Sequence, residues 1–286
     1  MYARKEAASK RSNAYRQLAG MSPVPTPAAS QRVFITGASS GIGLALARHY
    51  LQQGATVAVT ARRLEPLQAL AAEFAAGRCL YYQVDVRDPQ AMQATAQAFM
   101  QQIGGVPDIV IANAGVSRGT LTEAAEDIAS FHTIFEINVF GLVHTFQPFI
   151  QAMQAQGRPG QLVGIASVAG IRGLPGAGAY SASKSAAITY LESLRSEMQH
   201  HGIGVTTIAP GYIRTPMTDV NPYAMPFIMD ADIAAGKFAQ AIARRKRYVV
   251  IPWQMGWVAR LLRIIPRGLW DRLTRNTQHK PRVPLE

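Results

Sequence analysis

The chain has 286 residues, and 48% of them are hydrophobic, so it can bury the core of one large domain. Its formal net charge of +12 lies at the ends, because residues 1–32 and 237–286 hold 18 of the 29 Lys and Arg but only 3 of the 17 Asp and Glu. This distribution argues against a nucleic-acid partner, the single Cys79 excludes an intrachain disulfide and a cysteine-rich metal site, and no apolar run reaches the roughly 18–20 residues that span a bilayer.

Residues 1–31 are rich in Ala, Ser, Arg and Lys and end in the Pro-rich stretch from Pro23 to Pro27. They have neither a helical period nor strand alternation, so we predict a flexible basic leader. Two alternatives are open. The start codon could lie upstream of a native Met21, or the basic, serine-containing start, which faintly resembles an organelle transit peptide, could be one.

Between residues 32 and 252, short apolar runs alternate with longer segments of helical spacing. This pattern is typical of a parallel sheet covered by helices on both faces. We therefore expect one doubly wound α/β domain, Rossmann-like, with a seven-stranded parallel sheet. The predicted strands are Val33 to Thr36, Thr56 to Thr60, Leu80 to Val84, Ile109 to Ala112, Leu162 to Ala166, Val205 to Ile208 and Tyr248 to Ile251.

A glycine-rich segment from Thr36 to Gly43 follows the first strand and opens the first helix. Backbone N–H groups and the helix dipole at such a junction can receive a pyrophosphate. Gly37 would permit the tight turn, Gly41 the approach of phosphate, and Gly43 close packing of helix on strand. The spacing G-x-x-x-G-x-G differs from the commoner G-x-G-x-x-G, so its position between strand and helix is what favours a dinucleotide site.

The second strand ends in arginines where many dinucleotide sites carry an acidic residue for the adenosine ribose. Arg62 and Arg63 occupy this position. A guanidinium suits a 2′-phosphate by its charge and its forked donors, so we expect NADP(H) rather than NAD(H). The alternative is that both arginines only begin the next helix in contact with solvent.

Tyr180 and Lys184 are four residues apart in a helical segment, which places them on one face. A tyrosine hydroxyl with a pKa near ~10 is a poor proton donor or acceptor at neutral pH, and a nearby ammonium lowers that pKa. Tyr180 would thereby become a usable proton carrier. The spacing alone is also common on helix surfaces.

Taken together, the motifs resemble those of the short-chain dehydrogenase/reductase family, over roughly Arg32 to Ile251. They follow the family's order: Thr36 to Gly43, Asn113-Ala114-Gly115, Asn138, Ser167, the pair of Tyr180 and Lys184, and Pro210-Gly211 followed by Thr215. Ala112 departs from the family, which often has a second Asn there. We expect the loop to stay intact because Asn113 remains.

The resemblance implies a role for each reactive residue. Tyr180 would donate a proton to the carbonyl oxygen, or accept it in the oxidative direction, and Ser167 would hydrogen-bond the reacting oxygen. Lys184 would lower the pKa of Tyr180 and hold the nicotinamide ribose. Asn138 would fix a water that links Lys184 to solvent.

The resemblance also implies the remaining cofactor contacts. Asp85 and Val86 would lie at the adenine, and Thr215 at the nicotinamide carboxamide. The full set of predicted cofactor-binding residues is Gly37, Ser39, Ser40, Gly41, Ile42, Gly43, Arg62, Arg63, Asp85, Val86, Asn113, Ala114, Gly115, Tyr180, Lys184, Pro210, Gly211 and Thr215. No metal ion is expected.

An apolar stretch follows Pro210-Gly211, where the family has its mobile substrate loop. We predict a substrate lid that includes Met217, Tyr223, Met225 and Phe227. Methionines adapt to irregular apolar shapes, so a lipophilic substrate is one interpretation. Packing of the same residues against the body is the other.

Residues 253–286 form a basic extension with apolar residues at helical spacing. Val258, Leu261, Leu262, Ile265 and Leu269 would share one side of an amphipathic helix that Pro266 kinks, with Arg260, Arg263 and Arg267 on another side. Basic residues with Trp257 and Trp270 suit a helix lying in a membrane interface over residues 253–275. The alternative is packing on the body or on a second subunit.

These observations predict an NADP(H)-dependent oxidoreductase that transfers a hydride to or from a carbonyl or alcohol carbon. We expect a lipophilic ketone or aldehyde of lipid metabolism, such as a steroid, a retinoid or a long-chain 3-oxoacyl compound. A non-catalytic dinucleotide-binding sensor or scaffold and a membrane-docking module are the alternatives. We expect a cytoplasmic protein, with peripheral membrane binding left open, and the resemblance implies a homodimer or homotetramer.

Overall fold

The computed structural model describes residues 31–157 and 160–282. The leader predicted over residues 1–31 therefore lies, apart from Gln31, outside the described residues. The fold below concerns the body and most of the C-terminal extension.

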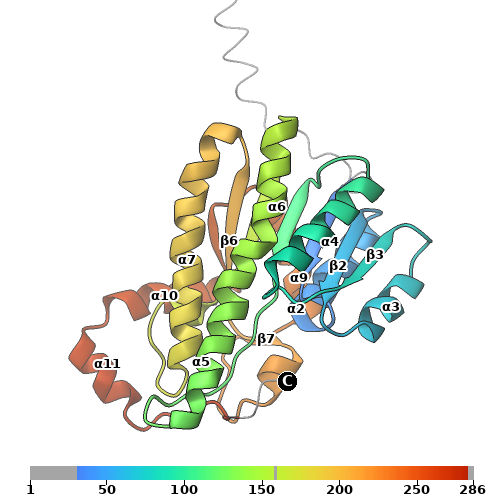
Figure 1. Cartoon of the computed structure of the whole chain (residues 1–286). Helices are drawn as coiled ribbons and strands as arrows, with labels where there is room; N and C mark the ends of the chain where they lie inside the picture. Colours follow the sequence, from blue (N-terminus) through green and yellow to red (C-terminus); the bar gives the residue numbers. More distant parts are fainter. Residues whose placement is uncertain (1–30, 158–159, 283–286) are drawn as a thin grey trace, which may run out of the picture.

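Within the described ranges, seven parallel strands form one sheet in the order β3-β2-β1-β4-β5-β6-β9 (Figure 1). The strands are β1 (Arg32–Thr36), β2 (Thr56–Ala61), β3 (Cys79–Gln83), β4 (Ile109–Ala112), β5 (Gln161–Ile165), β6 (Gly204–Pro210) and β9 (Tyr248–Ile251). The strand order reverses between β1 and β4, so the crossovers pass to both faces. This arrangement confirms the predicted doubly wound α/β fold, and each predicted strand is present to within two residues.

Helices cover both faces of this sheet. In Figure 1, α4, α6 and α7 lie in front of the strands and α2 and α9 lie behind them. The helices of the described residues are α2 (Gly41–Gln52), α3 (Glu65–Ala72), α4 (Pro89–Gln102), α5 (Ile128–Phe135), α6 (Gly141–Gln156), α7 (Gly178–Met198), α8 (Pro216–Asp219), α9 (Ala231–Ala243), α10 (Trp253–Ile264) and α11 (Arg267–Thr274). Two short strands that the sequence did not predict, β7 (Ile213–Arg214) and β8 (Met229–Asp230), pair in parallel beside the substrate lid.

Alternation along the strands divides the core into two layers. In β1, Val33 and Ile35 face the helices α2 and α9, whereas Phe34 faces α4 and α6. Phe34 packs against Phe99 of α4 and Phe149 of α6, with ring centroids 5.6 and 4.7 Å away. Because successive side chains of a strand point to opposite faces, a fully apolar strand such as β1 requires helices on both sides.

The C-terminal extension forms two helices instead of the single kinked helix that we predicted. Ile265 has an extended backbone with ψ of 123°, and α11 begins directly after Pro266. A residue before proline is forced out of the helical region by contact with the pyrrolidine ring, and proline lacks the N–H that would continue the helix. Pro266 therefore separates α10 from α11.

In the ranges that the structure describes, no helix has both the length and the hydropathy required to cross a bilayer.

Candidate active site

The glycine-rich segment forms a tight turn between β1 and α2. Gly37 and Gly41 have φ of +69° and +56°, in the left-handed region that favours glycine. Both line a cavity of about 660 Å³, as do Ser39, Ser40 and Ile42. Ser40 makes no side-chain hydrogen bond at the start of α2, so the first N–H groups of this helix are not capped by it.

Gly43 lies where the glycine turn, α2 and the loop after β4 pack closely together. It does not line the cavity, and a Cβ there would collide with the Gly37 carbonyl and the Asn113 side-chain amide. The position therefore accepts only glycine because helix, turn and β4 meet there. This agrees with the close packing expected of Gly43, and its contact with the cofactor stays a prediction.

Arg62 and Arg63 lie at the same cavity, next to the glycine turn, and both are exposed. The guanidinium of Arg63 donates to the Ser39 hydroxyl at 3.3 Å. The Gln83 side-chain amide donates to the Arg62 backbone carbonyl at 2.9 Å, which fixes the end of β2 beside β3. Two positive groups therefore border the end of the cavity nearest the Gly37 turn.

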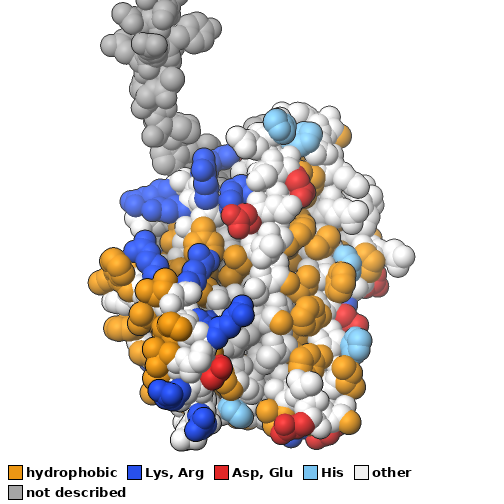
Figure 2. All heavy atoms as spheres, turned by 90° about the vertical axis from the view of Figure 1, so that its left-hand side faces the viewer, with side chains coloured by type: hydrophobic (Ala, Val, Ile, Leu, Met, Phe, Trp, Pro, Cys, Tyr) orange, Lys and Arg blue, Asp and Glu red, His pale blue; other side chains and the backbone are white. Residues whose placement is uncertain are grey.

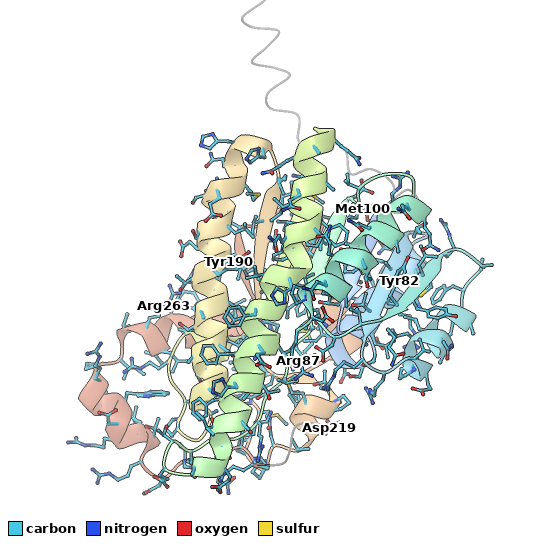
Figure 3. All side chains as sticks on the ribbon, in the orientation of Figure 1. Tyr82, Arg87, Met100, Tyr190, Asp219 and Arg263 are labelled. Atoms are coloured by element: carbon cyan, nitrogen blue, oxygen red, sulfur yellow. The ribbon has the colours of Figure 1, made fainter. Side chains whose placement is uncertain are left out.

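Asp85 and Val86 follow β3 and also line the cavity. The Asp85 carboxylate accepts from the Arg87 backbone N–H at 3.0 Å and from its guanidinium at 2.7 and 2.9 Å. Burial alone would raise the pKa of Asp85, but the hydrogen bonds from Arg87 outweigh it and lower the pKa. Figure 3 labels Arg87 near the centre of the molecule, by α6.

Asn113, Ala114 and Gly115 follow β4 and line the same cavity. The Asn113 amide donates to the carbonyls of Thr36 and Gly37 at 2.9 and 3.1 Å, which ties β4 to the glycine turn. The Thr36 hydroxyl accepts from the backbone N–H groups of Asn113 and Ala114 at 3.1 and 3.2 Å. Sequence reasoning missed this role of Thr36, although a threonine between a buried strand and the glycine turn is a usable signal.

Ser167, Tyr180 and Lys184 come together in the lining of the same cavity. Ser167 follows β5, and its side chain hydrogen-bonds Tyr180 and accepts from the Ala169 N–H at 3.1 Å. The Lys184 Nζ lies 5.9 Å from the centre of the Tyr180 ring and donates to the Ile165 carbonyl at 2.9 Å. One turn of α7 and the end of β5 thus assemble the predicted reactive group.

The acid–base properties of this group differ from the expectation. Burial raises the pKa of Tyr180, and the hydrogen bond with Ser167 lowers it by less. Burial lowers the pKa of Lys184 to about 8. In this structure the pKa of Tyr180 therefore lies above its ordinary value, because desolvation outweighs the hydrogen bond with Ser167.

Asn138 lies behind the reactive group, in the short π-helix η3 (Glu136–Phe140). Its amide donates to the Val116 carbonyl and the Ser183 hydroxyl at 3.0 Å each, and its oxygen accepts from the Val116 N–H at 2.9 Å. These contacts hold the loop after β4 against α7. Single-turn π-helices often occur at functional sites. The water that Asn138 would fix stays a prediction.

The end of β6 and the following loop close the cavity. Pro210, Gly211 and Thr215 line it, and a Cβ at Gly41 would lie 3.1 Å from the Thr215 methyl group. Thr215 caps α8 with Thr218 in a capping box. The two sides of the cavity therefore approach each other at Gly41 and Thr215.

The structure separates the four predicted lid residues. Met217 lines the cavity, whereas Tyr223, Met225 and Phe227 do not. Tyr223 stacks edge-on against Tyr212, with ring centroids 6.4 Å apart, and Phe227 is exposed. Of the four predicted lid residues, Met217 alone therefore contributes to the lining of the cavity.

The cavity has the shape and donor set for a nicotinamide dinucleotide. Its glycine turn lets the backbone approach a ligand closely, the start of α2 offers N–H groups, and two arginines border it. Lys184 and Tyr180 line the same cavity. The fold and the cavity together define a dinucleotide-dependent oxidoreductase.

Comparison with known proteins agrees with this class. The sequence model of the short chain dehydrogenase family matches residues 31–224. The chain is 37% identical over 243 residues to an uncharacterized oxidoreductase of Myxococcus xanthus, covering 84% of this chain and 95% of that protein. It is 34% identical over 273 residues to dehydrogenase/reductase SDR family member 7B of Bos taurus, covering 87% and 82%.

Solved structures show the same fold. A short chain dehydrogenase/reductase from Burkholderia phymatum, in complex with NAD, matches with a TM-score of 0.74 over 91% of this chain and 99% of that chain, at 24% identity. On the family-model match and these identities, the 286-residue chain belongs to the short-chain dehydrogenase/reductase family. Oxidoreductases of that family typically use a nicotinamide dinucleotide.

Proposed function

We propose that this protein is an NADP(H)-dependent reductase of lipophilic ketones or aldehydes, with oxidation of the matching alcohol as the reverse reaction. One observation carries the proposal: Ser167, Tyr180 and Lys184 line the same cavity as Arg62 and Arg63. A sensor that had lost chemistry would not need the reactive group intact.

Each side chain then has a defined task. The bound nicotinamide supplies or accepts the hydride. Ser167 hydrogen-bonds the substrate oxygen and stabilises negative charge that develops there. Tyr180 donates its proton to that oxygen in reduction and takes it back in oxidation. Lys184 holds positive charge beside Tyr180, and Asn138 keeps the loop carrying Gly115 in place.

Two features support the finer details of cofactor and substrate. Arg62 and Arg63 favour a 2′-phosphate because a guanidinium binds phosphate through charge and paired donors. The substrate end of the cavity is bordered by apolar groups, including Val116, Ile213 and Met217. This lining favours a carbonyl on an apolar skeleton.

Tyr180→Phe tests the chemistry. This change removes the proton donor but keeps the ring, so NADPH should bind as before while turnover falls by about 10²- to 10⁴-fold. The substrate is first found by following NADPH oxidation across steroids, retinoids, long-chain 3-oxoacyl compounds and small aldehydes. Tyr190→Phe, on the same helix but outside the cavity, is the matched control. Normal turnover by Tyr180→Phe would refute the assignment.

Replacing both Arg62 and Arg63 by Ala tests the cofactor preference. A hydrogen bond to a charged group is worth about 1.5–3 kcal/mol, so kcat/KM with NADPH should fall by roughly ten- to a hundredfold, with little change for NADH. Arg78→Ala, at the turn before β3, serves as the control. If the wild type uses NADH as well as NADPH, the argument from these arginines is wrong.

A further inference from the structure

The helix α10 has two apolar faces, and only one of them is covered. Met255 and Ala259 are buried in a small cluster with Val168, and Val258 and Leu262 pack against it. The second face of α10 carries exposed apolar side chains, and α11 adds further exposed apolar side chains. This α10–α11 surface consists of Trp253, Trp257, Leu261, Ile264, Leu269 and Leu273.

This exposure is unusual for such side chains. Trp253 and Ile264 are 68% and 76% exposed. Trp253, Trp257, Leu261 and Ile264 recur at helical spacing, so they form one stripe rather than scattered positions. A contiguous apolar stripe of this kind marks a binding surface more often than it marks ordinary solvent-exposed protein.

Positive charge surrounds the stripe. Residues 253–274, which span both helices, contain four Arg and a single acid, Asp271. The Arg260 guanidinium lies 4.8 Å from the centre of the Trp257 ring. Figure 3 shows Arg263 at the outer side of α10, and Figure 2 shows basic side chains among the hydrophobic ones on this side of the molecule.

We propose that the α10–α11 surface docks on an anionic lipid bilayer. Tryptophan with arginine is the composition that suits the boundary between acyl chains and headgroups, where indole rings lie at the interface and cations meet lipid phosphates. The helices are already fixed on the body, because the Arg172 guanidinium donates to the carbonyls of Leu262 and Ile265 at 2.7 Å each. Docking therefore requires no folding of this surface.

A second copy of this chain fits the surface less well. A two-fold dimer would place the same patch on both sides of the interface. Arg260, Arg263 and Arg267 would then face their own counterparts with only Asp271 to offset them, which costs free energy in a desolvated interface. A lipid surface with negative headgroups supplies the charge that the chain lacks.

The surface is also connected to the cavity. The chain continues from α11 toward α8, where the Lys280 Nζ donates to the Met217 carbonyl at 3.0 Å (Figure 1). Met217 lines the cavity. Docking would therefore hold the substrate end of the cavity close to the bilayer, although the proposal itself rests on the surface and not on catalysis.

Tryptophan fluorescence can report on the α10–α11 surface. All three tryptophans, Trp253, Trp257 and Trp270, lie on α10 or α11. Titration of the full chain with phosphatidylcholine vesicles containing phosphatidylserine should shift tryptophan emission to the blue. Vesicles of phosphatidylcholine alone should produce a much smaller shift, and added salt should weaken binding.

A matched pair of variants identifies the surface. The double variant Ile264→Ser with Arg260→Glu should weaken binding at least about tenfold, since it removes an exposed apolar group and reverses a charge. Ile233→Ser with Lys237→Glu makes the same changes four residues apart on α9 and should bind like the wild type. Residues 1–30 are present in every variant, so their basic side chains contribute equally.

Three results would overturn the proposal. The first is no binding of the wild type to anionic vesicles, and the second is equal binding by the two double variants. The third is a wild-type dimer in sedimentation equilibrium that Ile264→Ser with Arg260→Glu converts to a monomer, which would assign the surface to a second copy. A thermal unfolding scan checks that each variant folds. Trp257→Ser is an independent change in the same surface and should also weaken binding to anionic vesicles. NADPH turnover in detergent-free buffer separates this test from that of the reductase.

Discussion

Lys184 is a cation in a place that excludes most water. Its side chain is 5% exposed and donates one hydrogen bond, to the Ile165 carbonyl at 2.9 Å. A Cβ at Gly115 would come within 3.3 Å of the Lys184 Nζ, so the glycine leaves room on the cavity side. An ammonium has three donors, and those that remain can hold a ligand. Burial of the positively charged Lys184 therefore lowers the free energy of unfolding of the protein.

This cost predicts a pH dependence of stability. Burial lowers the pKa of Lys184 from 10.5 to about 8, so the folded state binds fewer protons than the unfolded chain between these values. The free energy of unfolding of the wild type should therefore rise relative to Lys184→Met as pH increases from about 8 to 10.5. The expected gain is of the order of 3 kcal/mol.

Urea unfolding of both proteins near pH 7.5 and near pH 10 measures the effect. Comparison with Lys184→Met cancels the contribution of the other titrating groups. Lys237→Met, at an exposed position of α9, is the control and should show no such dependence. A difference between wild type and Lys184→Met that does not change with pH would contradict the burial argument.

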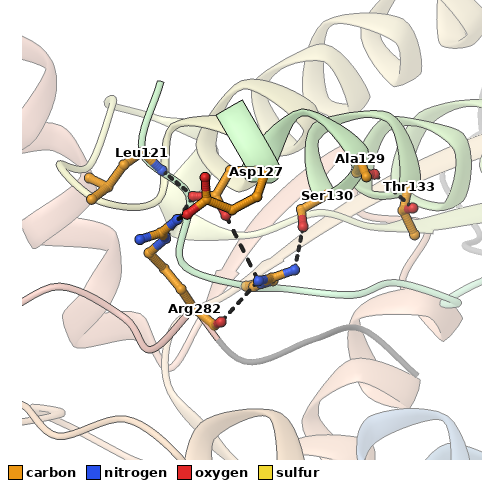
Figure 4. A network of polar contacts seen from close by, with 8 residues as sticks. Leu121, Asp127, Ala129, Ser130, Thr133 and Arg282 are labelled. Atoms are coloured by element: carbon orange, nitrogen blue, oxygen red, sulfur yellow. Dashed lines mark hydrogen bonds and ion pairs between the residues drawn. The ribbon is translucent and has the colours of Figure 1, made fainter. Parts of the chain in front are cut away.

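At the scale of an element, the segment after α11 acts as a strap across the molecule. The Arg282 guanidinium donates to Asp127 at 2.8 Å and to Glu126 at 2.6 Å (Figure 4). The Pro281 carbonyl accepts from the Gly119 N–H at 3.0 Å. The hydrogen bond from Arg282, followed by one from the Leu121 N–H at 2.8 Å, lowers the pKa of Asp127. The strap thus links the C-terminal segment to the loop after β4.

Arg282→Ala should release this strap. The Asp127 side chain is fully buried, and without Arg282 its nearest cation is Arg118, at 3.8 Å. Because the Gly119 N–H bonds to Pro281, its hydrogen exchange reports directly on the strap and should become about tenfold faster. KM for a lipophilic substrate should rise, since the same segment contacts Met217, while kcat changes little.

Two further variants complete this test. Arg282→Lys keeps the charge but loses the forked donors, so its exchange rate should fall between those of the wild type and Arg282→Ala. Arg272→Ala, an exposed change in α11, should leave the exchange of Gly119 unchanged. Exchange of Gly119 in Arg282→Ala at the wild-type rate would show that the remaining contacts hold the strap unaided.

Across the whole molecule, charge is separated by position in the chain. Residues 33–236 hold 11 Lys and Arg against 14 Asp and Glu, so the catalytic body is slightly acidic while both ends are basic. On an anionic surface the body would be repelled and the α10–α11 surface attracted. Under the docking proposal, this asymmetry orients the protein with its C-terminal helices toward the lipid.

Much of this protein could be read from local patterns. Buried parallel strands such as β1 and β4 are continuous apolar runs, so their positions appear in the sequence. The glycine turn and the pair of Tyr180 and Lys184 are also local, because a strand–turn–helix and one helical turn fix their geometry. The family's order of motifs supplied Ser167 and Asn138, which lie far from Tyr180 in the chain or on another element.

The tertiary structure decided what covers each face. Periodicity placed Val258, Leu261 and Leu262 on one apolar side, but packing partly buries Val258 and Leu262 and leaves Leu261 exposed. The ion pair of Arg282 with Asp127 joins residues 155 positions apart, and no local pattern reports such a contact. The sequence by itself determined the strands, the glycine turn and the pair of Tyr180 and Lys184, because each depends on neighbours in the chain. Only the folded chain decided the pKa of Tyr180, the strap and the open face of α10, because these depend on which distant groups exclude water.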